Sequence, residues 1–140
     1  MSMKEFVIGA DVCNLEAVQG FVHGMLEGKA CSAKIRMQLD FVVEEIFVNI
    51  ASYAYGEGYG DVVIRGIVKD SPFMLELSFL DEGIPYNPLL HEDPDLTLSA
   101  EERELGGLGI AMMKKNVDRI HYEYKNGKNV LTIGKELKEK

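Results

Sequence analysis

The stretch that decides the fold covers residues 33–55 and reads AKIRMQLDFVVEEIFVNIASYAY. Its apolar residues recur at helical spacing, and Ser32 before it is a suitable N-cap. The main apolar stripe consists of Ile35, Leu39, Val42, Val43, Ile46 and Ile50. Glycines at positions 56, 58 and 60 then interrupt the pattern. The sequence therefore predicts a long amphipathic helix over about residues 33–55.

A narrow polar strip runs along the same helix between two apolar patches. It holds Gln38, Glu45 and Asn49, and the last two are one helical turn apart. The second patch consists of Met37, Phe41 and Val48. A carboxylate and a carboxamide are costly to bury without partners. The strip therefore faces water or lines a site, and helix geometry leaves both open.

The flanking segments predict an α+β domain. We expect a strand over 4–10, a helix over 12–29, and two hairpins that pair 62–68 with 73–80 and 120–124 with 130–137. Asn126 and Gly127 favour a tight turn in the second hairpin. Hairpins make a largely antiparallel sheet, and its apolar face needs helices to cover it. No linker divides the chain, so residues 1–140 are expected to form a single domain.

Residues 84–105 interrupt this order, with three of the four prolines and no sustained period. A connection of that length is usually a lid or a binding loop. It ends in glycines at 106, 107 and 109, which we expect to open a helix that runs to about Val117. A helix start favours a bound phosphate, although close packing of helices would also explain the glycines.

Asp81, Glu82 and Gly83 directly follow the predicted strand 73–80. An Asp at a strand end can accept a hydrogen bond from an amino group of a ligand, and a Gly lets another group approach the backbone closely. An ordinary turn has the same composition, so this segment alone does not decide between the two.

The overall charge narrows the class of partner. The 140 residues carry a net charge of −8, which argues against wrapping duplex nucleic acid or binding an anionic membrane. No apolar run approaches the ~20 residues of a membrane helix, and no secretory leader is evident. The two cysteines stand in no metal-binding spacing. We expect a reduced cytoplasmic protein that binds small molecules or proteins.

Three short segments follow one another along the chain: EIFVN at residues 45–49, DEGIPYNP at 81–88 and GGLGI at 106–110. They resemble the N box and the two glycine boxes of the GHKL (Bergerat-fold) ATPases. Within that superfamily the chain resembles the anti-sigma factor serine/threonine kinases, and Ala54-Tyr55 and the final strand GKNVLTI (127–133) support the likeness. The resemblance covers nearly the whole chain. It implies a two-layer α+β sandwich, a largely antiparallel mixed sheet covered on one face by helices, and an ATP lid at about 84–105.

The resemblance also implies roles for individual residues. Asn49 would hold the Mg²⁺ that bridges the phosphates of ATP, and Asp81 would read the adenine amino group while Gly83 admits the base. Glu45 would be the general base for the attacking hydroxyl. The cradle for the phosphates would consist of Gly106, Gly107, Leu108 and Gly109.

The function implied by the resemblance is that of a bacterial anti-sigma factor. It would bind a sigma factor, use Mg²⁺-ATP to phosphorylate a Ser or Thr of an antagonist protein, and form a homodimer. Two alternatives stay open: a module whose nucleotide-dependent lid controls partner binding without phosphoryl transfer, and a structural domain without nucleotide. The chain departs from the kinases at Tyr53, where many have His, and at Leu105, where some have a basic residue. Both departures bear on turnover.

Overall fold

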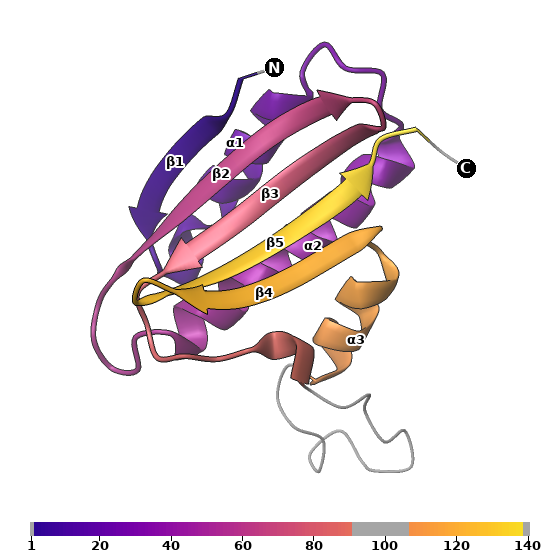
Figure 1. The fold of residues 1–140 in the computed structure, drawn as a ribbon. Coiled ribbons are helices and arrows are strands. Elements are labelled where there is room, and N and C mark those ends of the chain that lie inside the picture. Colours follow the sequence, from indigo (N-terminus) through magenta and orange to yellow (C-terminus); the bar gives the residue numbers. More distant parts are fainter. Residues whose placement is uncertain (1, 91–106, 139–140) are drawn as a thin grey trace.

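The protein folds into a sheet layer and a helix layer (Figure 1), described here from a computed structural model for residues 2–90 and 107–138. The strands are β1 (Lys4–Gly9), β2 (Asp61–Asp70), β3 (Phe73–Asp81), β4 (Arg119–Lys125) and β5 (Lys128–Glu136). They form one sheet in the order β1-β2-β3-β5-β4, and every neighbouring pair is antiparallel. All predicted strands are present, within two residues of their expected bounds.

Helices α1 (Leu15–Leu26) and α2 (Ala33–Tyr53) cover one face of the sheet, and α3 (Gly107–Lys115) lies at its β4 side (Figure 1). This arrangement confirms the predicted α+β fold class. Two short 3₁₀ turns, η1 (Val12–Asn14) and η2 (Pro88–Leu90), complete the described elements. Across residues 2–90 and 107–138, no helix has both the length and the apolar character needed to cross a membrane.

The helix predicted over 12–29 is shorter at both ends. Asp11 accepts a hydrogen bond from the N–H of Cys13 (2.9 Å), which closes the 3₁₀ turn η1 before α1 begins. At the other end, Glu27 adopts an extended conformation and Gly28 has a φ of +77°. The apolar period itself runs from Leu15 to Leu26, so the bounds predicted beyond these two residues were too wide.

The start of α2 matches the prediction, because the Ser32 hydroxyl accepts a hydrogen bond from the N–H of Ile35 (3.2 Å). Its apolar stripe packs on β2, β3 and β5 to form the core. The largest fully buried side chains are Phe47, Phe79, Leu26, Leu39, Ile64, Met74, Leu75, Leu77, Met113, Ile133 and Leu137. In the second apolar patch Met37 is 70% exposed, whereas Val48 is half-buried and Phe41 packs against the core, so the patch is divided between surface and core.

The turn between β4 and β5 forms as predicted, with positive φ at both Asn126 (54°) and Gly127 (77°). Positive φ at two successive residues is the property of the tight hairpin turns that match the twist of paired strands. This turn sets the register in which β5 lies between β3 and β4.

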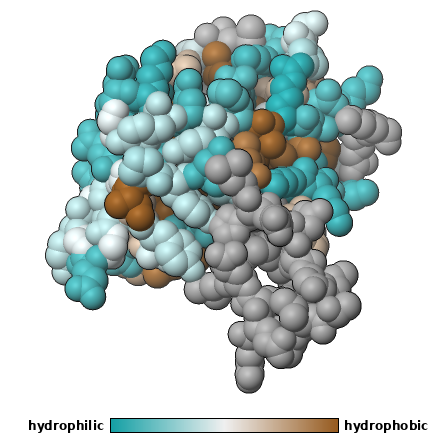
Figure 2. All heavy atoms as spheres, turned by 60° about the horizontal axis from the view of Figure 1, so that its bottom comes forward, coloured by the Kyte–Doolittle hydropathy of each residue, from teal (hydrophilic) through white to brown (hydrophobic). Residues whose placement is uncertain are grey.

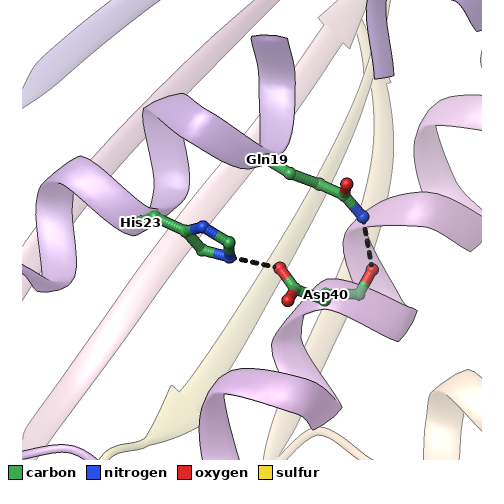
Figure 3. Close-up of polar contacts among 3 residues, drawn as sticks. All are labelled: Gln19, His23 and Asp40. Carbon is green, nitrogen blue, oxygen red and sulfur yellow. Dashed lines mark hydrogen bonds and ion pairs between the residues drawn. The ribbon is translucent and has the colours of Figure 1, made fainter. Parts of the chain in front are cut away.

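A polar contact joins α1 to α2 on the outer side of the helix layer (Figure 3). His23 Nε2 lies 2.6 Å from a carboxylate oxygen of Asp40, and Gln19 Nε2 donates to the Asp40 carbonyl over 3.4 Å. Because the His23 and Asp40 side chains are exposed, such a pair contributes at most ~1 kcal/mol. Burial of the apolar side chains between the helices and the sheet therefore holds α1 in place.

Candidate functional site

A hollow opens where β3 ends beside the C-terminal half of α2. The lining is mostly apolar, with a few polar side chains. It consists of Ile46, Asn49, Ile50, Tyr53, Ala54, Phe79, Asp81, Ile84, Tyr86, Pro88, Met113, Tyr122, Asn129 and Leu131. Figure 2 looks onto this end of the molecule, where apolar patches are set in a mainly hydrophilic surface. A mostly apolar lining with a few polar groups is typical of a site for a small organic ligand.

Asp81 is the buried charged group of this hollow, with 6% of its surface exposed. One carboxylate oxygen, Oδ1, accepts hydrogen bonds from the N–H of Gly83 and from Nδ2 of Asn129, both over 2.9 Å. The other oxygen, Oδ2, accepts none from residues 2–90 or 107–138. Burial raises the pKa of Asp81, and the two hydrogen bonds offset part of that rise. A buried acceptor without a donor is well suited to a ligand that brings a donor.

Asn49 lines the hollow from α2. Its Nδ2 donates to the carbonyl of Glu45 over 2.6 Å, so the side chain is anchored to the preceding turn. Its Oδ1 accepts no hydrogen bond within the described part of the chain, which leaves an oxygen free to act as a ligand. Asn49 and Asp81, predicted from separate segments, therefore meet in one site.

Glu45 lies one turn before Asn49 but does not line the hollow. Partial burial, together with the charge of Glu44, raises the pKa of its carboxyl group. Gln38 is farther away and lines a different groove with Lys34 and Lys135. The polar strip predicted on α2 is therefore divided: its C-terminal part reaches the hollow, and its N-terminal part does not.

Gly83 has a different neighbour from the one the sequence suggested. A Cβ atom at this position would collide with the carbonyl group of Ala54, at the end of α2. The same carbonyl accepts a hydrogen bond from the N–H of Ile84 (2.8 Å), and the Tyr55 hydroxyl accepts one from the N–H of Glu82 (2.9 Å). The end of α2 is thus clamped to the segment after β3, and this clamp explains the glycine. Admission of a base by Gly83 stays a prediction.

Gly107, Leu108 and Gly109 form the first turn of α3. Such a turn carries N–H groups without partners inside the helix, as a phosphate site requires. Met113 on the same helix is buried and lines the hollow. Gly106, Leu105 and residues 91–105 of the predicted lid lie outside the described residues.

The segment before that gap is tied to α3. Lys114 donates from Nζ to the carbonyl of Leu89 over 3.3 Å. This contact joins the last turn of α3 to the η2 turn. The charge is still located in the last turn of α3, where it also favours the dipole.

Asn129 is a site residue that the sequence analysis missed. It is 94% buried on β5, lines the hollow and bonds to Asp81. The signal available was an amide at residue 129, in alternation with Leu131 and Ile133, which places it on their face of the strand. Its link to Asp81 depends on the β3–β5 pairing, which joins residues 48 positions apart.

The donor set suits one kind of metal site. No group of three or more His, Cys, Asp or Glu residues that could hold an ion exists among residues 2–90 and 107–138. Mg²⁺ commonly uses one or two protein oxygens together with waters and the phosphates of a nucleotide. The unpartnered Oδ1 of Asn49 fits a cation of that kind.

An antiparallel sheet backed by two helices, with a buried Asp in a mostly apolar hollow and a glycine-rich helix start, defines a compact ligand-binding domain of the ATPase type. Residues 8–135 match the family description "Histidine kinase-like ATPase domain", and the chain belongs to this family. The resemblance inferred from the three boxes is thereby confirmed.

Individual relatives agree with this assignment. The chain is 28% identical over 102 residues to the serine/threonine-protein kinase BtrW of Bordetella bronchiseptica, which covers 73% of this chain and 71% of that protein. The structure of the RsbU and RsbW domains of Rv1364c from Mycobacterium tuberculosis superposes with a TM-score of 0.68 at 12% identity. That match covers all of this chain, which spans 34% of the Mycobacterium chain. A blue-light activated histidine kinase domain from Erythrobacter litoralis EL346 matches with a TM-score of 0.56 at 15% identity, over 90% of this chain and 60% of that one. These two structures support the fold.

Proposed function

We propose that this protein binds Mg²⁺-ATP in the hollow beside Asp81 and phosphorylates a Ser or Thr of a protein that opposes an anti-sigma factor. The observation that carries the proposal is the buried Asp81 carboxylate, of which one oxygen is occupied and the other has no donor among the residues that the structure describes. Membership of an ATPase domain family supports ATP as the ligand. The relative named as a serine/threonine-protein kinase supports the type of transfer.

Base recognition follows from the chemistry of Asp81. Its free oxygen would accept a hydrogen bond from the exocyclic amino group of adenine, while apolar side chains such as Ile50 and Leu131 contact the ring. Guanine and hypoxanthine have a carbonyl oxygen where adenine has this amino group. An acceptor would then face an acceptor, so the site should prefer ATP.

Asn49 would hold the metal through Oδ1, because its Nδ2 is already engaged with Glu45. When bound there, Mg²⁺ would supply positive charge against the phosphates during phosphoryl transfer. The first turn of α3, at Gly107 to Gly109, would donate backbone N–H groups to the same phosphates. Gly106 would extend this cradle.

Glu45 is the proposed general base. The substrate hydroxyl oxygen bonds to the γ-phosphorus, the bond from that phosphorus to the bridging oxygen of ADP breaks, and Glu45 takes the hydroxyl proton. The raised pKa of Glu45 brings this carboxyl closer to the range of an effective base near neutral pH.

The second candidate function is regulation by nucleotide without phosphoryl transfer. It is favoured by the position of Glu45, which does not line the hollow, and by Tyr53, which does. Many kinases of the resembling group have a His where this chain has Tyr53. In this alternative ATP would set the conformation of the lid, and partner binding would depend on nucleotide alone.

One experiment separates the two candidates. Nucleotide binding is first measured by calorimetry with and without Mg²⁺. Absence of ATP binding would refute both candidate functions. The protein is then incubated with labelled ATP and a small antagonist protein encoded beside its gene, and phosphoserine or phosphothreonine is quantified. We expect Glu45→Gln to lower the rate of phosphorylation by about 10² or more with ATP affinity unchanged, and Glu16→Gln, at an exposed position on α1, to leave that rate unchanged. ATP-dependent partner binding without phosphoprotein would favour the regulatory module.

The sigma factor, the antagonist, the homodimer and the cytoplasmic location stay predictions. We also propose that no direct contact with nucleic acid or membrane is involved, in keeping with the net charge of −8. Sedimentation of the purified protein with and without Mg²⁺-ATP would test the dimer.

A further inference from the structure

The side-chain amide of Asn129 uses all of its hydrogen-bonding capacity inside the protein. Nδ2 donates to Oδ1 of Asp81 and to the carbonyl of Ile84, both over 2.9 Å. Oδ1 accepts from the N–H of Tyr86 over 3.0 Å and from the hydroxyl of Tyr122. An amide has two donor hydrogens and two acceptor lone pairs, so this buried group is completely satisfied.

These partners leave the amide one orientation. The Asp81 carboxylate and the Ile84 carbonyl can accept but not donate, so they require the NH₂ end. The backbone N–H of Tyr86 can donate but not accept, so it requires the oxygen end. A flip would therefore mismatch three contacts, since only the Tyr122 hydroxyl can donate or accept, and Asp81 is held by a donor of fixed position.

We propose that Asn129 is a positioning residue for base recognition: it holds Oδ1 of Asp81 so that Oδ2 stays free for the amino group of adenine, and it ties the Ile84–Tyr86 segment to that carboxylate. The inference rests on the proposed binding of ATP. Asn129 connects four parts of the site, namely the end of β3, the segment after it, β4 through Tyr122, and its own strand β5.

The side chain required at this position is specific. A carboxylate at 129 would face the Asp81 carboxylate and the Ile84 carbonyl with no donor between them. An apolar side chain of similar size would remove the donor to Asp81 and to the Ile84 carbonyl, together with the acceptor of the Tyr86 N–H. A hydroxyl offers one donor where the amide offers two, and would restore part of the arrangement.

The test compares nucleotides that differ at the amino group. Calorimetric affinities for ATP and inosine triphosphate, which carries a carbonyl there, are measured for wild type, Asn129→Leu and Asn129→Thr. We expect wild type to bind ATP at least about tenfold more tightly than inosine triphosphate. In Asn129→Leu the ATP affinity should fall about tenfold or more while that for inosine triphosphate changes less than about threefold. The ATP affinity of Asn129→Thr should lie between those of wild type and Asn129→Leu.

A matched control exists on the same pair of strands. Ser78 and Thr132 also face each other across β3 and β5 and share a 2.8 Å hydrogen bond, but on the face without helices. Thr132→Val removes that bond and should leave both nucleotide affinities unchanged. Equal weakening of the two nucleotides in Asn129→Leu would reduce Asn129 to a structural role and overturn the proposal, as would unchanged affinities.

A second readout needs no nucleotide. The Asp81 carboxyl is titrated by NMR in the free protein; loss of the Asn129 donor should raise its pKa, because that hydrogen bond stabilises the ionised form. An unchanged pKa would contradict the proposal. If Asn129→Leu does not fold, the same measurements on Asn129→Thr and Tyr122→Phe test the proposal. Tyr122→Phe keeps the Asn129 amide and removes one of its hydrogen bonds. Failure of wild type to bind ATP would instead refute the proposed function.

Discussion

Two cross-strand pairs on β3 and β5 show how one sheet supports both structure and recognition. Asp81 lies opposite Asn129, and three residues earlier Ser78 lies opposite Thr132. Both pairs are joined by one side-chain hydrogen bond, of 2.9 Å and 2.8 Å. The first pair is buried beneath the helices and leaves a carboxylate oxygen unused, whereas the second is half-buried on the open face. Burial and an unused acceptor, rather than the hydrogen bond itself, distinguish the candidate site.

The largest expected effect is that of Asp81→Asn on nucleotide affinity. The new amide can keep its oxygen toward Gly83 and Asn129, which places an NH₂ group where adenine would bring its own donor. We expect ATP binding to weaken roughly a hundredfold, measured by calorimetry. Asp70→Asn, at an exposed position at the other end of the hairpin, is the control. Equal ATP affinity in wild type and Asp81→Asn would show that the Asp81–Asn129 pair is no more involved in recognition than the Ser78–Thr132 pair.

Next in size is the effect of Gly83→Ala on stability. Its methyl group would meet the Ala54 carbonyl, so α2 or the segment after β3 must shift. We expect a loss of about 1–3 kcal/mol in urea unfolding. Gly24→Ala is the matched control, because nothing lies within 4 Å of a Cβ there, and it should be neutral or stabilising by up to about 1 kcal/mol. Similar effects of the two substitutions would contradict a tight clamp at Ala54.

The buried pair should also respond to pH, whereas the open-face pair contains no titrating group. Because the folded-state pKa of Asp81 lies above the ordinary value of 3.8, its contribution to stability is present below that value and is lost as pH rises through the raised pKa. ATP affinity should rise over the same interval, since the ionised form accepts the amino group. Urea unfolding and ATP titration between pH 4 and 7 of wild type and Asp81→Asn isolate this contribution from that of Glu45. If stability and ATP affinity vary with pH in the same way in both proteins, the predicted contribution of Asp81 is refuted.

The smallest effect is expected on the open face. Ser78→Ala removes the hydrogen bond to Thr132 and should cost about 1 kcal/mol or less, because a half-buried hydroxyl left behind can bind water. Urea unfolding gives the stability change, and calorimetry should give an unaltered ATP affinity. A clear loss of affinity would show that the two faces of this strand pair are coupled.

Much of the fold could be predicted because its determinants are local. Helical spacing from Ile35 to Ile50, the Ser32 cap and the Asn126-Gly127 turn each act within a few residues, and all were confirmed. The predicted ends of α1 were wrong, because residues 12–14 form a 3₁₀ turn capped by Asp11 and Glu27 is extended, and neither feature is marked in the apolar spacing.

The site was only partly predictable. Asn49 and Asp81 were found through ordered segments and do meet in one hollow, while Gln38 shares the face of α2 but lies too far along it. The neighbour of Gly83 and the partners of Asn129 depend on how α2 and β5 pack against β3. Contacts between residues so distant in the chain leave no periodic trace in a single sequence.

The strand that ends in Asp81 is the middle strand of the five, with hydrogen-bonded neighbours on both sides. Amides in such a strand exchange with solvent mainly when the whole domain opens, because no edge is free to fray. A ligand held at its end is therefore linked to global unfolding, and at a concentration one hundred times its Kd it would add about 2.7 kcal/mol to the stability of the entire domain. Hydrogen exchange at the centre of the sheet, far from any contact with the ligand, should report occupancy of the hollow.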